Sequence, residues 1–357
     1  MAFSPGENDI AIVGVAQTDA HARFEGPEVV LIMECVNRLL SDAKIERDDV
    51  GFTIAGSCDY LSGMPFAFVS NVDGMGAWPP VYESHVEMDG AWALFEAWLR
   101  LQMGDIDVAM VVGSGKSSPC NAREVFHLQA DPYVVAPLGI DPDAMAGIQA
   151  QALVNAGKAS EADIADVVVR SRANASSNPH AQLTDAVSAD ELLAAPYDMA
   201  PLRAHDVSAK ADGAAAMLIA RRDRALELTD SPVWITGLDH RIESHHAGLR
   251  DLTDSPSTRL AATGAGAFDG DVDVAELHVL HAHEEIILRD ALGLDDVAKV
   301  NPSGGPLAGD PVMATGLTRI IEVAKRIAGG DATRGIAHAT SGAALQQNLV
   351  CVLEGGS

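Results

Sequence analysis

Carboxylates stand at a place in the sequence where they could perform acid–base chemistry. Glu87 and Asp89 lie within three residues of each other, immediately before an apolar segment that starts at Gly90. Carboxylates at the start of a helix can cap its free backbone N–H groups and meet the positive end of its dipole. They can also serve as general bases in an adjoining pocket. Both interpretations are open for these two residues.

Histidines form a second group of candidates. His278, His281 and His283 follow one another closely, and a His-x-His spacing on a strand is compatible with a metal site. No third ligand is evident, so we expect no metal. Taken alone, His278 is expected to be a hydrogen-bonded core histidine at the end of a strand. The four cysteines show no CxxC spacing, which disfavours a zinc site and fits reduced thiols.

Composition limits the classes of function. The chain has 357 residues, is 48% hydrophobic and carries a net charge of −27. Such an acidic surface repels nucleic acid and anionic membranes, so we expect neither as a partner. We find no signal peptide and no apolar run of the roughly 18 residues that a membrane span needs. We therefore expect a cytoplasmic protein without a membrane span.

Short apolar runs alternate with helical patterns along the chain. This alternation predicts an α/β fold with a mostly parallel sheet covered on both faces. The segment from about 117 to 200 is richer in Pro, Asp, Ser and Asn and is expected to elaborate this core. A second cycle of strands and helices follows it. Strands are expected at 10–15, 52–55, 108–112, 233–235, 274–279, 336–339 and 349–353, and helices at 29–40, 91–101, 143–156, 160–176, 284–292 and 316–327.

One segment is specific enough to indicate a family. NPSGGPLAGDPVMATGLTRI, residues 301–320, resembles the thiolase signature NxSGGxxxxGHPxGATGxxR, with ten positions in register at the start of a helix. The segments 207–220 and 273–294 resemble two further thiolase blocks, the latter in the form found in sterol-carrier-protein thiolases. The opening stretch resembles the block that holds the thiolase nucleophile. The chain therefore resembles the thiolase superfamily, in its sterol-carrier and lipid-transfer-like branch, which includes thiolase-like steroid aldolases.

The resemblance implies a fold, a ligand and partners. It implies the five-layer αβαβα thiolase fold, with an N-terminal half 1–225 and a C-terminal half 226–357. Acyl-CoA would be the substrate, with coenzyme A as part of it and no separate cofactor. Family members usually form dimers or dimers of dimers, and this branch often works with a small zinc-ribbon/OB-fold protein. The implied substrate-binding residues are Asn301, Ser303, Gly304, Gly305 and Gly342.

The resemblance also shows what this chain lacks. By count from Gly90, Glu87 stands where thiolases have the nucleophilic cysteine, and Asp310 replaces the histidine of the GHP motif. The second thiolase cysteine corresponds to Ala339. His278 occupies the position that binds the thioester oxygen. The chain is thus not expected to be a cysteine-dependent thiolase.

The remaining acidic groups suggest other chemistry. Glu87 or Asp310 could be a general base, and His278 the donor to an enolate oxygen. If Glu87 and Asp310 face one pocket, they are expected to share a proton as a coupled pair, with a raised pKa. In the alternative interpretation Asp310 only caps a loop.

Three functions stay open at this stage. The first is retro-aldol C–C cleavage of an acyl-CoA in lipid or steroid side-chain degradation, as an acyl-CoA C–C lyase. The second is a catalytically silent, acyltransferase-fold subunit paired with an active thiolase-like chain. The third is an acyl-CoA or lipid-binding protein without chemistry. The chain is accordingly expected in a homo- or hetero-oligomer.

Overall fold

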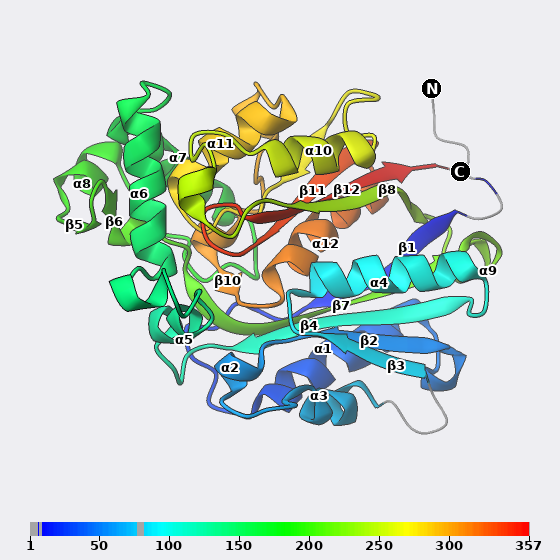
Figure 1. Ribbon diagram of the computed structural model, residues 1–357. Coiled ribbons are helices and arrows are strands. Elements are labelled where there is room, and N and C mark those ends of the chain that lie inside the picture. Colours follow the sequence, from blue (N-terminus) through cyan, green and yellow to red (C-terminus); the bar gives the residue numbers. More distant parts are fainter. Residues whose placement is uncertain (1–5, 7–8, 77–81, 357) are drawn as a thin grey trace.

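The strands form two joined half-sheets, and a pair of helices lies between them (Figure 1). The structure is a computed structural model that describes residues 6, 9–76 and 82–356. One half has the strand order β3 (Tyr82–Val86), β2 (Phe52–Gly56), β4 (Val108–Lys116), β7 (Lys210–Arg221), β1 (Ile10–Gln17), and the other has β8 (Val233–Ile242), β12 (Gln347–Gly355), β11 (Arg334–Ser341), β9 (Val274–Glu276). Within the described part of the chain, two residue pairs join β1 to β8.

Helices complete the five layers (Figure 1). α4 (Gly90–Met103) and α12 (Thr315–Ala328) lie between the two half-sheets. α1 (Glu28–Ala43) and α3 (Phe68–Met75) cover the outer face of the first half, and α10 (Pro256–Gly264) and α11 (Ala282–Leu292) cover that of the second. The αβαβα architecture predicted from the sequence is confirmed. The division into halves at residue 225 stays a prediction; this residue lies within α9 (Arg222–Leu228).

The sheet is mixed, so the expectation of a mostly parallel sheet is wrong. Strand pairs β2–β3, β2–β4 and β9–β11 are parallel, whereas β4–β7, β1–β7, β1–β8, β8–β12 and β11–β12 are antiparallel. β11 and β12 are joined by a short turn, which can connect only antiparallel neighbours. β7 returns to the sheet after the long segment 117–209, and its direction could not be inferred from apolar patterning.

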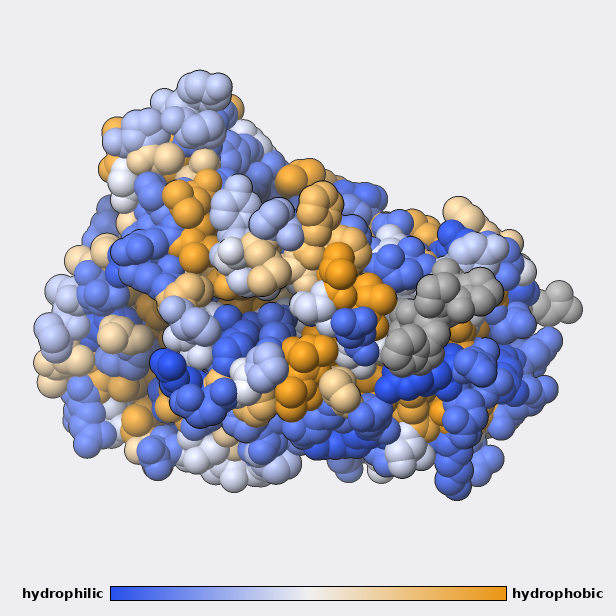
Figure 2. All heavy atoms as spheres, turned by 90° about the horizontal axis from the view of Figure 1, so that it is seen from below, coloured by the Kyte–Doolittle hydropathy of each residue, from blue (hydrophilic) through white to orange (hydrophobic). Residues whose placement is uncertain are grey.

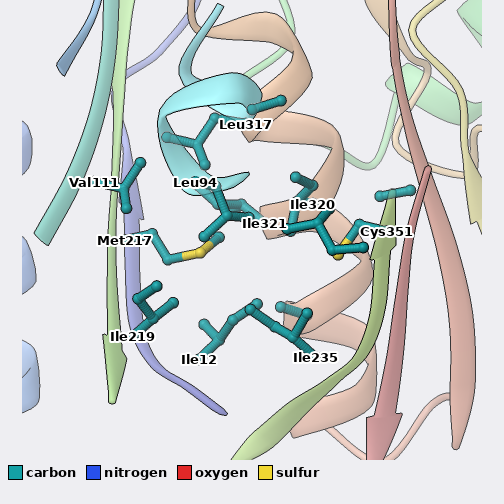
Figure 3. Packing of buried hydrophobic residues seen from close by; sticks show 14 of the residues in the cluster. Ile12, Leu94, Val111, Met217, Ile219, Ile235, Leu317, Ile320, Ile321 and Cys351 are labelled. Carbon is teal, nitrogen blue, oxygen red and sulfur yellow. The ribbon is translucent and has the colours of Figure 1, made fainter. Parts of the chain in front are cut away.

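The middle layer holds the main hydrophobic core. Leu317, Ile320 and Ile321 of α12 and Leu94 of α4 point between the two half-sheets (Figure 3). Their three-to-four spacing predicts these buried faces. On the second half-sheet the same core includes Cys351, a fully buried thiol that behaves as a small hydrophobic residue. The predicted helices at 91–101 and 316–327 are therefore confirmed as central elements.

The segment 117–200 packs at one end of the layers (Figure 1). Its helices α6 and α7 pack against α11 and the loop before it, through one apolar cluster. It therefore elaborates the core, as the composition indicates. The elements of this segment and of the chain just after it are α5 (Ala122–Leu128), α6 (Pro142–Asn155), α7 (Glu161–Ala175), α8 (Ala189–Ala194), β5 (Tyr197–Met199) and β6 (Leu202–Arg203). Two short elements lie elsewhere in the fold, α2 (Asp59–Ser62) and β10 (Asp310–Pro311).

The surface agrees with the acidic composition. Figure 2 shows one face of the molecule, on which hydrophilic residues predominate and hydrophobic residues gather in small groups. Within residues 6, 9–76 and 82–356, no helix combines the length and the apolar character needed to cross a membrane.

A single carboxylate fixes the start of both middle helices. Asp89 accepts hydrogen bonds from the backbone N–H groups of Ala91 in α4 (2.8 Å) and of Gly316 (2.9 Å) and Leu317 (3.1 Å) in α12. Two helix N-termini thus share one buried anion, which also meets the positive ends of both helix dipoles. Residue 316 must be glycine here, because a Cβ atom would lie 2.5 Å from Asp89 Oδ1. Of the two interpretations of Asp89, the structure shows the helix cap.

The first testable prediction concerns this cap. We expect Asp89→Asn to lower the free energy of unfolding at pH 7 by about 1–3 kcal/mol, because the amide must leave at least one buried N–H unpaired. Burial raises the pKa of Asp89 from 3.8 to about 6, against the effect of its three N–H donors. The folded state then binds more protons than the unfolded state between about pH 4 and 6, so the wild-type protein loses stability relative to Asp89→Asn as the pH rises through this window.

Urea unfolding at several pH values checks both statements. Asp296→Asn is the matched control, because Asp296 is an exposed cap that accepts only one helix-terminal N–H, from Ala298. Asn is as good a cap as Asp at such a position, so its effect is expected to be near zero. An Asp89→Asn protein as stable as the control would show that the shared cap is not needed.

Candidate active site

A cavity of about 870 Å³ lies where the first half, the second half and the 117–200 segment meet. Loops that follow β3, β9 and β11 bring polar groups to it, and residues of the 117–145 segment close its other side. Its wall is largely apolar. The apolar lining includes Met88, Phe126, Ile140, Met145, Leu280 and Val312. A cavity of this size with few polar groups is typical of a site for an organic ligand.

Glu87 lies at this cavity, one residue beyond the end of β3. Its side chain is exposed, and Oε1 accepts the backbone N–H of Asp59 at 2.6 Å. Asp89, two residues later, takes the first N–H of α4. The two carboxylates therefore have different surroundings, because Asp89 is buried in the cap and Glu87 faces the cavity.

Asp310 also lies at the cavity, but it has a cationic partner. Lys210 Nζ lies 2.6 Å from Asp310 Oδ2, and the hydroxyls of Ser208 and Thr315 donate to the same carboxylate at 2.7 and 2.6 Å. Although burial opposes it, the charge of Lys210 and the hydrogen bonds from Lys210 and Thr315 lower the pKa of Asp310 to about 2. The raised pKa expected for Asp310 is therefore wrong, and the condition for its action as a base is not met.

The expected proton sharing between Glu87 and Asp310 is not supported, because the pKa of Asp310 is lowered. Asp310 forms its ion pair with Lys210, and the carboxylate whose pKa it raises is that of Asp89, after the larger effect of burial. Glu87 is thereby left as the exposed acidic side chain closest in sequence to the start of α4.

His278 lies at the cavity in the loop after β9, which ends at Glu276, three residues earlier than predicted. Its Nδ1 accepts the backbone N–H of Thr340 at 3.4 Å. Burial lowers the pKa of the ring to about 3, so the imidazole is neutral at physiological pH. A neutral ring that accepts at Nδ1 carries its hydrogen on Nε2. His278 can therefore donate one hydrogen bond from Nε2 without changing charge.

The other two histidines of this segment have different partners. His281 lies between Asp143 (3.0 Å) and Glu284 (3.2 Å), and although burial opposes it, these carboxylates raise its pKa to about 9. His281 is thus a charged ion-pair partner that ties α6 to α11. His283 Nε2 lies 3.1 Å from the side-chain oxygen of Gln149. Among the described residues, no group of His, Cys, Asp and Glu side chains is arranged to hold a metal ion.

The signature loop makes internal contacts. Asn301 Oδ1 accepts the N–H of Leu277, and Ser303 donates to Glu276, which also pairs with Arg319. The structure does not bring Asn301, Ser303, Gly304 or Gly305 to the 870 Å³ cavity, whereas Gly342 lines it. Among the five implied substrate-binding residues, only Gly342 stands where a ligand in this cavity would touch it.

The cysteines do not supply a thiolate. Cys58 and Cys120 line the cavity, and burial raises the pKa of both thiols. Cys35 and Cys351 lie in the core, where burial raises the pKa of Cys35 to about 12 and that of Cys351 further. A thiol with a raised pKa is a poor nucleophile at neutral pH.

Sequence reasoning did not place two polar groups at the cavity, although Lys210, with Lys116 and Arg203, was an unranked candidate for a contact with coenzyme A. Lys210 stands at the first position of β7 and Thr340 near the end of β11, and both line the cavity. Lys210 lies in the thiolase-like block 207–220, which could have marked it. Thr340 lies beside Ala339, the residue at the second cysteine position. Ala339 itself packs in the middle-layer core.

Comparisons with known proteins extend over nearly the whole chain. The acetyl-CoA acetyltransferase of Methanothermobacter thermautotrophicus is 26% identical, with 94% of each chain covered. The non-specific lipid-transfer protein-like 2 of Caenorhabditis elegans is 23% identical, over 97% of this chain and 94% of its own. The benzoylsuccinyl-CoA thiolase subunit BbsB of Thauera aromatica is 24% identical, over 67% of this chain and 68% of its own.

Solved structures show the same architecture. A structure described as "Ltp2-ChsH2(DUF35) aldolase" has a TM-score of 0.80 at 18% identity and covers 97% of this chain and 98% of its own. Human mitochondrial 3-ketoacyl-CoA thiolase has a TM-score of 0.79 at 16% identity, with 99% and 100% covered. No protein-family model matches the sequence.

The fold, the signature segment and the full-length relatives agree with one another. Neither position at which the resemblance predicts a cysteine holds one in this chain. Over nearly its whole length the chain is similar to proteins of the thiolase superfamily, including its sterol-carrier and lipid-transfer-like branch, and it has no cysteine at the two positions where the resemblance places the catalytic cysteines.

Proposed function

We propose that this protein cleaves a carbon–carbon bond of a β-hydroxyacyl-CoA by a retro-aldol reaction. It is a thiolase-like, acyl-CoA-related protein. One observation carries the finer proposal: the cavity presents an exposed carboxylate, Glu87, and a neutral donor, His278, while the thiols beside them have raised pKa values. These groups suit proton transfer and enolate stabilisation, and they do not suit an acyl-cysteine intermediate.

The reaction balances with these groups alone. Glu87 removes the proton of the β-hydroxyl group, and the C–O bond becomes a carbonyl. The electron pair of the Cα–Cβ bond moves to the thioester, whose enolate oxygen accepts a hydrogen bond from His278 Nε2. The proton then passes from Glu87 to Cα, which gives a ketone or aldehyde and a shorter acyl-CoA. Nothing is oxidised or reduced, so no cofactor beyond the CoA of the substrate is required.

The cavity supports a bulky acyl group. Its volume of about 870 Å³ is at the upper end of ordinary ligand pockets, and its wall is mainly apolar. The aldolase described above has the same fold. A branched or polycyclic acyl chain, such as a steroid side chain, fits these properties, so a role in lipid or steroid side-chain degradation is part of the proposal.

A second candidate function is that of a silent subunit. One relative is described as a thiolase subunit, and one structural neighbour combines a thiolase-fold chain with a second protein. In this chain β3 is an edge strand with Tyr82, Glu83 and His85 exposed. Met64 and Phe66, in the loop between α2 and α3, are also exposed. Unpaired strand edges and exposed apolar groups favour association, so an oligomer with a thiolase-like or zinc-ribbon/OB-fold partner is part of the proposal.

The second testable prediction concerns the base. We expect Glu87→Gln to reduce kcat for cleavage of a β-hydroxyacyl-CoA by about 10²–10⁴-fold, since it removes the proton acceptor and keeps the shape. Release of the ketone product measures the reaction, in the protein alone and mixed with the products of neighbouring genes. Glu83→Gln is the matched control, because Glu83 is an exposed residue of the same strand that does not line the cavity.

Two outcomes would contradict the proposal. Thiolysis of a 3-oxoacyl-CoA by the isolated chain would require a nucleophile that the cavity does not offer. Cleavage that occurs only in a mixture, and that is unchanged by Glu87→Gln and by changes at His278, would assign the chemistry to the partner and favour the silent subunit.

The third testable prediction uses the pKa of His278. We expect His278→Phe to lower kcat by about a hundredfold, as loss of one oxyanion donor does. The pKa of the ring is about 3, so it does not titrate between pH 5 and 8. The pH of half-maximal rate is therefore expected to stay the same in this variant while the rate falls. A shift of the acidic limb in His278→Phe would show that the imidazole itself is the titrating group.

A further inference from the structure

Lys210 has a position and a free donor that the contacts of the fold do not explain. Its side chain is 34% exposed, while that of Asp310, its ion-pair partner, is 1% exposed. Register fixes the pair, because Lys210 and Asp310 are direct partners in the parallel bridge between β7 and β10. In-register neighbours place their side chains on the same side of a sheet, so the ammonium is held over the carboxylate at the edge of the cavity.

The hydrogen-bond count leaves one donor of Lys210 for a ligand. An ammonium carries three N–H donors. One goes to Asp310 Oδ2 at 2.6 Å and one to Ser208 Oγ at 2.9 Å. Among the described residues no third acceptor is recorded, and Lys210 lines the cavity together with His278. The third N–H is therefore available to a group in the cavity.

The charges around Lys210 favour a negative ligand atom there. Asp310 is also held by Thr315 and Ser208, so its carboxylate is fixed and does not swing into the cavity. The positive charge of Lys210 reaches His278, whose pKa it helps to lower after the larger effect of burial. The charge of Lys210 also acts on Asp143, which is already paired with His281.

We infer that Lys210 is a further catalytic residue, whose third N–H and the Nε2–H of His278 together bind the thioester oxygen and stabilise the enolate. Asp310 is the positioning residue that holds the ammonium. The cation of Lys210 takes over the place left by the lost signature histidine, whose position Asp310 now occupies. The inference rests on the proposed function, since it assumes that the cavity binds an acyl-CoA thioester.

The fourth testable prediction measures enolate formation apart from cleavage. A 3-oxoacyl-CoA, which cannot undergo retro-aldol cleavage, forms an enolate with a strong near-ultraviolet absorbance. We expect the full chain to lower the apparent pKa of enolisation of this bound probe, and Lys210→Met to abolish the absorbance increase while the probe still binds. Cleavage of a β-hydroxyacyl-CoA by Lys210→Met is expected to fall about a hundredfold.

Two further variants keep the test decisive. Lys210→Met leaves Asp310 buried without its cation, so Lys210→Met/Asp310→Asn removes both charges and guards against loss of folding. Lys158→Met is the matched control, an exposed lysine outside the cavity whose Nζ donates to the carbonyl of Thr253.

The outcomes separate this inference from the proposed function. An enolate signal in wild type that either Lys210 variant retains would overturn the role of Lys210, whatever the cleavage assay gives. A wild-type protein that binds the probe without any enolate signal would also overturn it. An enolate signal that requires Lys210, in a protein that cleaves no β-hydroxyacyl-CoA, would support the enolate site and reject retro-aldol cleavage.

Discussion

The carboxylate of Asp89 is the interaction on which the arrangement of the middle layer depends. It joins the first turns of α4 and α12, which come from residues more than 200 positions apart, through three backbone N–H groups. Both helices are buried between half-sheets, where unpaired N–H groups have no water to bind. Since Gly316 allows the close approach, one anion serves two helix ends. The cavity lies at these ends, so the cap also sets the position of its polar groups.

This cap also explains why two acids stand at the start of one helix. In a thiolase the start of this helix would stabilise a thiolate, but here Asp89 accepts the available N–H groups of both helices. Glu87 receives one N–H, from Asp59, and remains exposed to the cavity. The different surroundings of Glu87 and Asp89 follow from geometry, because only Asp89 lies within reach of the N–H groups of both helices, whereas Glu87 is open to a molecule in the cavity.

The sequence could predict the elements whose pattern is set by burial, and the site only in part. α12 and β1 follow from apolar periodicity, and the segment 301–320 indicated the family. β3, with the sequence YESHV, has exposed faces and no apolar pattern, so only its place before the apolar helix indicated a strand there. The NPSGG loop was assigned to the substrate because its residues match a signature, yet they bond inward. The cation beside Asp310 was not foreseen, since Lys210 is 100 residues away and only the β7–β10 register brings it there.

The balance of charge along the cavity differs from that of the whole chain. The whole chain has 51 acidic and 24 basic residues, so an anion approaching most of its surface meets net repulsion. The described lining of the cavity instead combines the acids Glu87, Asp89, Asp141, Asp143 and Asp310 with the cations Arg123, Lys210, Arg250 and His281. Arg123 and His281 are neutralised by neighbouring carboxylates, whereas Arg250 donates to the carbonyls of Ala343 and Ala344 and Lys210 keeps one N–H unassigned. The lining of the cavity therefore has a more even balance of charge than the chain as a whole, and an anionic ligand there would meet the cationic groups of Lys210 and Arg250.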